Sequence, residues 1–187
     1  WWIPAEAGIL YRFSGVTDIR QLARAKPKAY AAKEGFTDTM VAKLYEDRRG
    51  DVWISTSYKD KLLRWDDRIN QITDISSLPD SPKNISHATS FAEDRPGNLW
   101  MGTYQGTGSS LTRYRDGKFR VFTKADGLPD NDRTDNLMMD RKGRLWFGTK
   151  ANGVGRIDDP TAEPLHITWY NRSNGLSTNR VESLIED

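Results

Sequence analysis

The sequence predicts an all-β protein built from about four four-stranded blades of a β-propeller. Three observations predict this fold. One phrase recurs with a period in the forties, and a Trp stands at the same place in each copy. Short segments of alternating apolar and polar residues lie between turns that contain Gly. A period of this length with strand-like alternation is typical of one propeller blade per repeat.

The recurring phrase consists of an acidic pair or a single Asp, a turn with Gly, and a strand that carries Trp and ends in Thr. Its complete copies span residues 46–56, 93–103 and 139–149, with the end of an earlier copy at 2–5 and the start of a later one at 184–187. The Trp residues at positions 2, 53, 100 and 146 are separated by 51, 47 and 46 residues. The predicted blades therefore span residues 1–40, 41–87, 88–133 and 134–180, and the next blade starts in 181–187.

Four strands are predicted in each complete blade. The first is short and apolar, as in 41–45, and an Asp-Arg-x-Gly turn leads to the second strand, which carries the Trp. Gly is expected in that turn because it adopts positive φ without steric cost. The third strand is represented by 62–65 and 111–114, and Asp116-Gly117 makes a hairpin turn into an alternating fourth strand at 118–123. Between blades, residues 19–34 are rich in Ala and Lys and are expected to form a short helix.

Composition excludes several classes of function. The 28 basic and 26 acidic residues give a net charge of +2, which does not select nucleic acid as a partner. The chain has no apolar stretch near 18 residues, so we expect no membrane contact from this region. It has no Cys, and its two histidines, His87 and His166, fall in different blades and make no convincing zinc site. No cofactor or metal is predicted.

The repeated acidic pairs, at 46–47, 93–94 and 186–187, allow two interpretations. Paired carboxylates can serve acid–base catalysis or bind calcium. Alternatively, Asp hydrogen-bonds to the backbone of the Gly turn that follows it. Because the pair recurs from blade to blade, whereas a catalytic residue is rarely needed in every repeat, we favour the turn. By the same reasoning the repeated Trp residues are expected in the core rather than at a ligand.

The copy Glu-Asp-Arg-Pro-Gly-Asn-Leu-Trp-Met-Gly-Thr at 93–103, with Leu-Thr-Arg-Tyr at 111–114 and Gly-Leu-Pro at 127–129, resembles the two-component regulator propeller repeat. The pattern of that family is roughly Glu-Asp-Arg-x-Gly-x-Leu-Trp-Ile-Gly-Thr. The match is best at 93–103 with 111–131, and at 140–149. Departures are Pro4 and Ser55 at positions where the family has Gly, Met139 in place of Glu, and residues 107–110 in place of a short Gly-Gly turn.

This resemblance implies a seven-bladed propeller in the periplasmic region of an inner-membrane histidine kinase or hybrid two-component regulator. It implies a sensor rather than an enzyme, with a polar small molecule such as a saccharide as the ligand. A run of four blades leaves two blade faces bare. We therefore expect the blades to close with the remaining ones or with a second copy, as a homodimer.

Loops between the second and third strands and the connectors between blades usually open on one end of a propeller, and binding residues are drawn from such loops. The predicted ligand-binding residues are Tyr58, Lys59, Lys61, His87, Tyr104, Gln105, Asn131, Arg133, Lys150, Asn152, Asn179 and Arg180. Their amide, basic and aromatic groups suit a polar or anionic ligand, such as an acidic saccharide. No catalytic residues are predicted.

Two alternatives stay open. One is a secreted propeller enzyme, a lyase or a glycoside-active protein, which should carry a non-repeated cluster of His with Glu or Tyr in one blade. The other is a scaffold that binds a protein partner. It differs from the sensor only in the size of what it binds.

Overall fold

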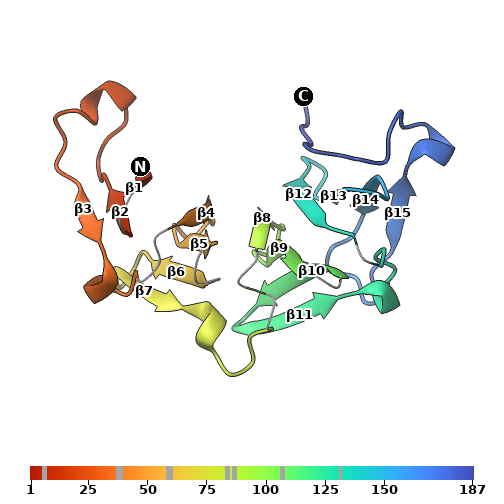
Figure 1. Cartoon of the computed structure of the whole chain (residues 1–187), viewed down its shortest axis with the longest axis horizontal. Coiled ribbons are helices and arrows are strands. Elements are labelled where there is room, and N and C mark those ends of the chain that lie inside the picture. Colours follow the sequence, from red (N-terminus) through yellow and green to blue (C-terminus); the bar gives the residue numbers. More distant parts are fainter. Residues whose placement is uncertain are drawn as a thin grey trace. The chain divides into compact units, whose positions relative to one another are not determined.

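The computed structural model is all-β and consists of four antiparallel sheets, shown in order along the chain in Figure 1. The structure describes residues 1–5, 8–36, 40–57, 61–82, 85, 88–105, 108–130 and 132–187; of residues 104–105 and 108–110 it describes the backbone alone. These residues form two compact units, Trp1–Ser77 and Leu78–Asp187. Each unit has a hydrophobic core of its own.

The first unit contains a three-stranded and a four-stranded sheet. The three-stranded sheet consists of β1 (Trp2–Ala5), β2 (Ile9–Arg12) and β3 (Lys28–Tyr30). The four-stranded sheet consists of β4 (Val41–Glu46), β5 (Val52–Thr56), β6 (Leu62–Asp66) and β7 (Gln71–Asp74). Single 3₁₀ turns occur at η1 (Ile19–Gln21), η2 (Ala32–Glu34) and η3 (Ile75–Ser77).

The second unit contains two four-stranded sheets. One consists of β8 (Ala88–Glu93), β9 (Leu99–Gln105), β10 (Gly108–Arg115) and β11 (Lys118–Phe122). The other consists of β12 (Thr134–Met139), β13 (Leu145–Thr149), β14 (Val154–Ile157) and β15 (Ile167–Tyr170). The strands of every sheet pair in sequence order, which is the connectivity of a propeller blade. The predicted fold class is therefore confirmed.

The turn between the first and second strands is built in the same way in each complete blade, around a buried Asp that accepts a hydrogen bond from the amide four residues on. In the second sheet of the chain, Asp47 accepts hydrogen bonds from the amide of Arg49 at 3.0 Å, the amide of Asp51 at 3.1 Å and the indole Nε1 of Trp53 at 3.0 Å. Gly50 stands in this turn at φ 83°. The buried Asp thus fixes both the turn and the ring of the next strand. The predicted structural role of the repeated Asp is confirmed.

The cores lie between consecutive sheets within each unit. In the first unit, Leu10 and Tyr30 pack with Ile54 and Trp65. In the second unit, apolar side chains of both sheets form one cluster, in which Trp100 is fully buried. Trp53 is fully buried as well. The predicted core role of the repeated Trp is confirmed at these two positions, whereas Trp146 is only partly buried.

The short helix expected over residues 19–34 is not what forms there. Only the two three-residue 3₁₀ turns η1 and η2 are helical in this stretch, and strand β3 lies between them. Pro27 stands directly before β3 and favours extended backbone in the residue before it. Tyr30 pairs with Leu10 of β2 and buries its ring, so the tertiary packing of the outer strand overrides the helix propensity of the Ala/Lys composition.

Candidate ligand-binding site

The loop between β2 and β3 is much longer than the Asp116-Gly117 hairpin that joins β10 and β11. It is held in shape by its own polar groups. Asp18 accepts a hydrogen bond from the amide of Arg20 at 2.9 Å, and the side chain of Gln21 accepts one from the amide of Thr17 at 3.2 Å. The indole Nε1 of Trp1 donates to the carbonyl of Val16 at 2.8 Å. The start of the loop is thereby fixed to the edge strand β1.

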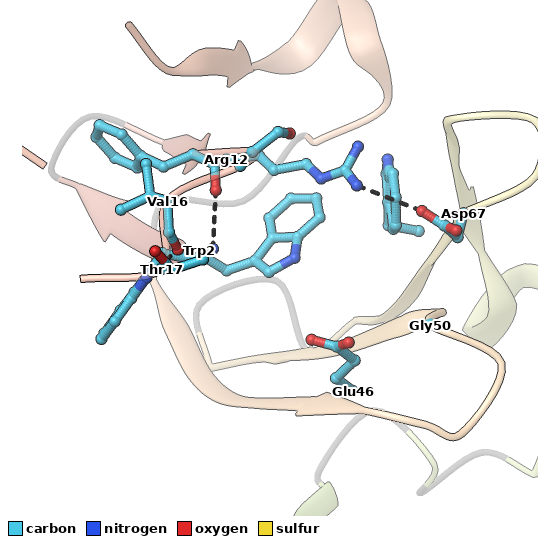
Figure 2. A pocket seen from close by; sticks show the side chains of 12 residues that line it. Trp2, Arg12, Val16, Thr17, Glu46, Gly50 and Asp67 are labelled. Atoms are coloured by element: carbon cyan, nitrogen blue, oxygen red, sulfur yellow. Dashed lines mark hydrogen bonds and ion pairs between the residues drawn. The ribbon is translucent and has the colours of Figure 1, made fainter. Parts of the chain in front are cut away.

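A cavity of about 480 Å³ opens beside this loop, at the end of the first unit where the β4–β5 and β6–β7 turns lie. Figure 2 shows the side chains around it. They come from the β2–β3 loop, from the β4–β5 and β6–β7 turns, and from or next to β1, β2, β4 and β6. The lining residues are Trp1, Trp2, Arg12, Phe13, Ser14, Gly15, Val16, Thr17, Glu46, Gly50, Trp65 and Asp67. The volume falls in the range of small-molecule sites in proteins.

Arg12 is the central cation of the cavity. Its guanidinium carbon lies 4.1 Å from the centre of the Trp65 ring and 5.6 Å from that of Trp2. Its Nη2 donates to the Asp67 carboxylate at 3.3 Å, the dashed line on the right of Figure 2. Trp2 and Trp65 meet edge to face with ring centres 4.9 Å apart. The cation is therefore held by two indole rings and one carboxylate before any ligand arrives.

The cavity also presents carboxylates to solvent. The Asp67 side chain is 48% exposed although it pairs with Arg12. Glu46 is exposed at the end of β4, and Figure 2 shows its carboxylate directed toward the space below Trp2. Among the residues that the structure describes, no cation pairs with Glu46. The two members of the acidic pair thus have different roles, since Asp47 fixes the turn and Glu46 faces the cavity.

The residues predicted from loops and connectors lie partly outside the described residues. Tyr58, Lys59, His87 and Asn131 fall in the gaps, and the side chains of Tyr104 and Gln105 are not described. Among the others, Lys61 pairs with Asp74 at 2.5 Å, and Arg180 pairs with Glu182. Of the remaining four, Arg133, Lys150 and Asn152 are brought together at one connector of the second unit. Asn179 lies in the segment after β15, where its side chain accepts a hydrogen bond from the amide of Arg172 at 2.8 Å.

That second cluster is organised by Asp132, which is buried. Its carboxylate accepts hydrogen bonds from the amides of Arg133 at 2.7 Å, Lys150 at 3.0 Å and Ala151 at 3.1 Å. The side-chain amide of Asn152 donates to it at 2.7 Å. Burial raises the pKa of Asp132, but the hydrogen bonds from Asn152, Arg133 and Ala151 outweigh it, so the pKa lies below its usual value. The arrangement ties the β13–β14 loop to the connector before β12.

The cavity of the first unit was missed by reasoning from sequence, which pointed to loops at the opposite end of the blades. Arg12 and Asp67 are 55 residues apart, and no local pattern links them. One signal was available. The stretch between the third and fourth strands of the first blade is far longer than its two-residue counterpart at Asp116-Gly117, and long loops of this kind are commonly functional.

The family model of the two-component regulator propeller matches the chain in three places, at residues 35–58, 81–105 and 127–151. The extracellular domain of BT4673 from B. thetaiotaomicron, described as a hybrid two component system, has a similar structure, with TM-score 0.66 and 20% sequence identity. The match covers 100% of this chain and 23% of that one, so the chain spans about a quarter of the length of this relative.

Structures of proteins with other functions are similar as well. Virginiamycin B lyase from Staphylococcus aureus matches with TM-score 0.63 and 20% identity over 90% of this chain and 50% of its own. PorZ, a surface component of the type-IX secretion system of Porphyromonas gingivalis, matches with TM-score 0.60 and 13% identity over 100% of this chain and 28% of its own. At these identities the likeness shows the fold. No curated protein sequence matches the chain.

Two further features bear on the site. Within the described ranges, no group of three or more His, Asp or Glu side chains is placed to hold a metal ion. No helix in the described part of the chain has the length and apolarity needed to cross a membrane.

Proposed function

We propose that this chain, whose blades carry two-component regulator propeller repeats, is a ligand-sensing region of a two-component sensor histidine kinase or hybrid regulator. In this proposal the blades lie outside the cytoplasm, bind a polar small molecule and transmit its presence to the kinase. The cavity of the first unit carries the proposal. It combines indole rings, a guanidinium and carboxylates in a space of ligand size, on a scaffold whose other repeated features serve packing.

The similarity to extracellular domains of two-component systems supports the location and the sensing role. Saccharides belong to the ligand class that we propose, because their hydroxyl groups and apolar ring faces match polar and aromatic groups that share one cavity. The similarity to virginiamycin B lyase supports a second candidate, a propeller enzyme. We prefer the sensor because the repeats match the regulator family.

A ligand screen tests this proposal. The extracytoplasmic region of the whole protein is melted in the presence of a library of polar small molecules, and each hit is titrated against kinase autophosphorylation in the full-length protein. A ligand that binds the folded state at 100 times its Kd should raise the stability by about 2.7 kcal/mol. The proposal predicts a hit that changes autophosphorylation. A library that stabilises nothing, or a hit that is chemically converted, would contradict it.

The proposal includes assembly. The blades close with the remaining blades of the protein or with a second copy, because an uncovered blade face exposes a large apolar surface. Light scattering on this chain should therefore give a dimer or larger species. A monodisperse, cooperatively folded monomer would exclude the second copy as the partner.

A further inference from the structure

From the charges around the cavity of the first unit we infer its selectivity: it takes a polyhydroxylated ring and discriminates against acidic ligands. This inference rests on the proposed function and names the ligand class of that site. It also replaces, for this site, the acidic saccharide expected from the basic residues of the loops. The ring is recognised by its hydroxyl donors and its apolar face, as a pyranose would be.

The first step concerns the positive charge. Among the described residues of the lining, Arg12 is the one with a basic side chain, and its charge is already compensated. Its guanidinium packs against the rings of both Trp2 and Trp65 and donates to Asp67. Its side chain is 28% exposed. An acidic ligand would have to displace Asp67 to gain a full ion pair with Arg12, so little net attraction for an anion remains.

The second step concerns the negative charge. Glu46 faces the cavity, and within the described residues nothing pairs with it. Among the described side chains of the lining, Arg12 and Asp67 compensate each other, and Glu46 contributes one uncompensated negative charge. An ionised carboxylate is an acceptor only, so it needs donors from the ligand. Hydroxyl groups supply such donors, whereas a second carboxylate would repel Glu46 and could not donate to it.

The third step concerns the apolar surface. Trp1 is 49% exposed, and its ring is held by the hydrogen bond from its Nε1 to the carbonyl of Val16. Trp2 is partly buried and packs on Trp65 and on Tyr30, at 4.9 and 5.5 Å between ring centres. Held indole rings of this kind offer a rigid apolar face at a low cost in conformational entropy. Aromatic faces beside carboxylate acceptors match a ring with one apolar face and hydroxyls at its edge.

Matched sugars test the inference. Cellobiose, maltose and lactose, their uronic acid counterparts and a glucosamine-containing disaccharide are titrated into the extracytoplasmic region at pH 7 by calorimetry and Trp fluorescence. At least one neutral disaccharide should bind about tenfold more tightly than its acidic counterpart. Glu46→Gln should weaken the neutral ligand by about tenfold, the effect of one lost charge-assisted hydrogen bond. The same variant should reduce the discrimination against the acid.

Glu182→Gln is the control, because Glu182 is an exposed carboxylate of the second unit and its removal changes the net charge equally. It should leave all affinities unchanged. The glucosamine-containing disaccharide, whose ammonium can pair with Glu46, should bind at least as tightly as the neutral one. The inference is overturned if the acidic sugar binds more tightly than the neutral or the amino sugar, if Glu46→Gln has no effect, or if no disaccharide binds. The last result leaves the proposed function standing when the polar library gives a hit of another class. If no compound of the polar library binds, both the inference and the proposed function are overturned.

Discussion

Arg113 lies directly across the sheet from Trp100, with its guanidinium carbon 5.5 Å from the centre of the indole ring. The same cross-strand pair recurs in every sheet, between the second and third strands of the blade. It joins Trp2 to Arg12, Trp53 to Arg64 and Trp146 to Arg156, with distances of 5.6, 5.6 and 5.5 Å. The complete repeats therefore share two structural features, the Asp that accepts a hydrogen bond from the indole Nε1 and the Arg that packs over the indole ring.

Replacing Arg113 with Met should reduce the free energy of unfolding by about 1–3 kcal/mol. The variant keeps the aliphatic contact but loses the cation over Trp100 and the ion pair to Glu163 at 2.6 Å. Urea denaturation measures the effect. Arg115→Met is the control, since the exposed pair of Arg115 with Asp116 should contribute less than about 1 kcal/mol. Equal losses in both variants would show that the stacked position has no special role.

The turn carboxylate Asp140 should make stability depend on pH in acid. Burial raises its pKa, but hydrogen bonds from Trp146 and Arg144 outweigh this and lower the pKa to about 2. Because the folded pKa lies below the unfolded value of about 3.9, the stabilisation is complete above about pH 5 and is lost as the pH falls toward 2. The difference corresponds to about 2 kcal/mol.

Asp140→Asn tests this, because an amide does not titrate. Urea midpoints are compared at pH 2 to 6 for the variant and the parent chain. The parent should lose more stability than the variant across this range, and the two curves should converge at low pH. Parallel curves would mean that Asp140 does not contribute to the acid sensitivity. Other carboxylates with lowered pKa values, such as Asp66, affect both proteins equally.

The blades could be predicted from sequence because their signals are local. Asp47 reaches the amide four residues on and the indole six residues on, so one short phrase contains the entire turn. The alternation of the outer strand β11 is also visible in its burial, since exposed and partly buried side chains alternate over residues 118–121. Repetition then identifies the Asp of the pair as structural, because a chemical role is seldom required in every blade. It does not distinguish Glu46, a repeated carboxylate that faces the cavity.

The cavity could not be predicted because its geometry is not local. Arg12, Glu46 and Asp67 come from different strands and turns, and only tertiary packing makes them neighbours. Polar residues in loops were also poor indicators of a ligand. The amide of Asn152 resembles a binding group in the sequence, yet in the structure it donates to the buried Asp132. Composition shows which groups are available, whereas the partner of each group depends on the fold.

Gly102→Ala should strongly destabilise the second unit. A Cβ atom at this position would lie 2.5 Å from the carbonyl oxygen of Thr134 and 2.7 Å from Oγ of Ser90. The carbonyl oxygen of Thr134 belongs to the backbone of the next blade, so the steric clash can be removed only if the two blades move apart. A loss of about 1–3 kcal/mol or more is expected. Gly148→Ala is a milder comparison, since its Cβ would approach Val181 at 3.0 Å. The packing argument is contradicted if Gly148→Ala lowers the melting temperature more than Gly102→Ala does.

Asn152→Ala and Lys150→Ala together decide whether the cluster around Asp132 is structural or binds a ligand. Asn152→Ala removes a 2.7 Å hydrogen bond from a buried carboxylate and should cost about 1–3 kcal/mol of stability. Lys150→Ala should cost little, because the exposed side chain is lost while its backbone amide still donates to Asp132. Thermal melts and titrations with a hit from the polar library measure both properties.

If the cluster is structural, Asn152→Ala lowers the melting temperature and Lys150→Ala does not. In that case the ligand affinity of the folded protein is unchanged in both variants. If the loops bind the ligand as the sequence predicts, Lys150→Ala lowers the affinity while its melting temperature stays unchanged. Arg133→Ala then follows the same pattern, since Arg133 contributes its backbone amide to Asp132 and pairs its side chain with Asp135 at 2.8 Å. That result would place the ligand at this end of the blades and away from the cavity beside Trp2.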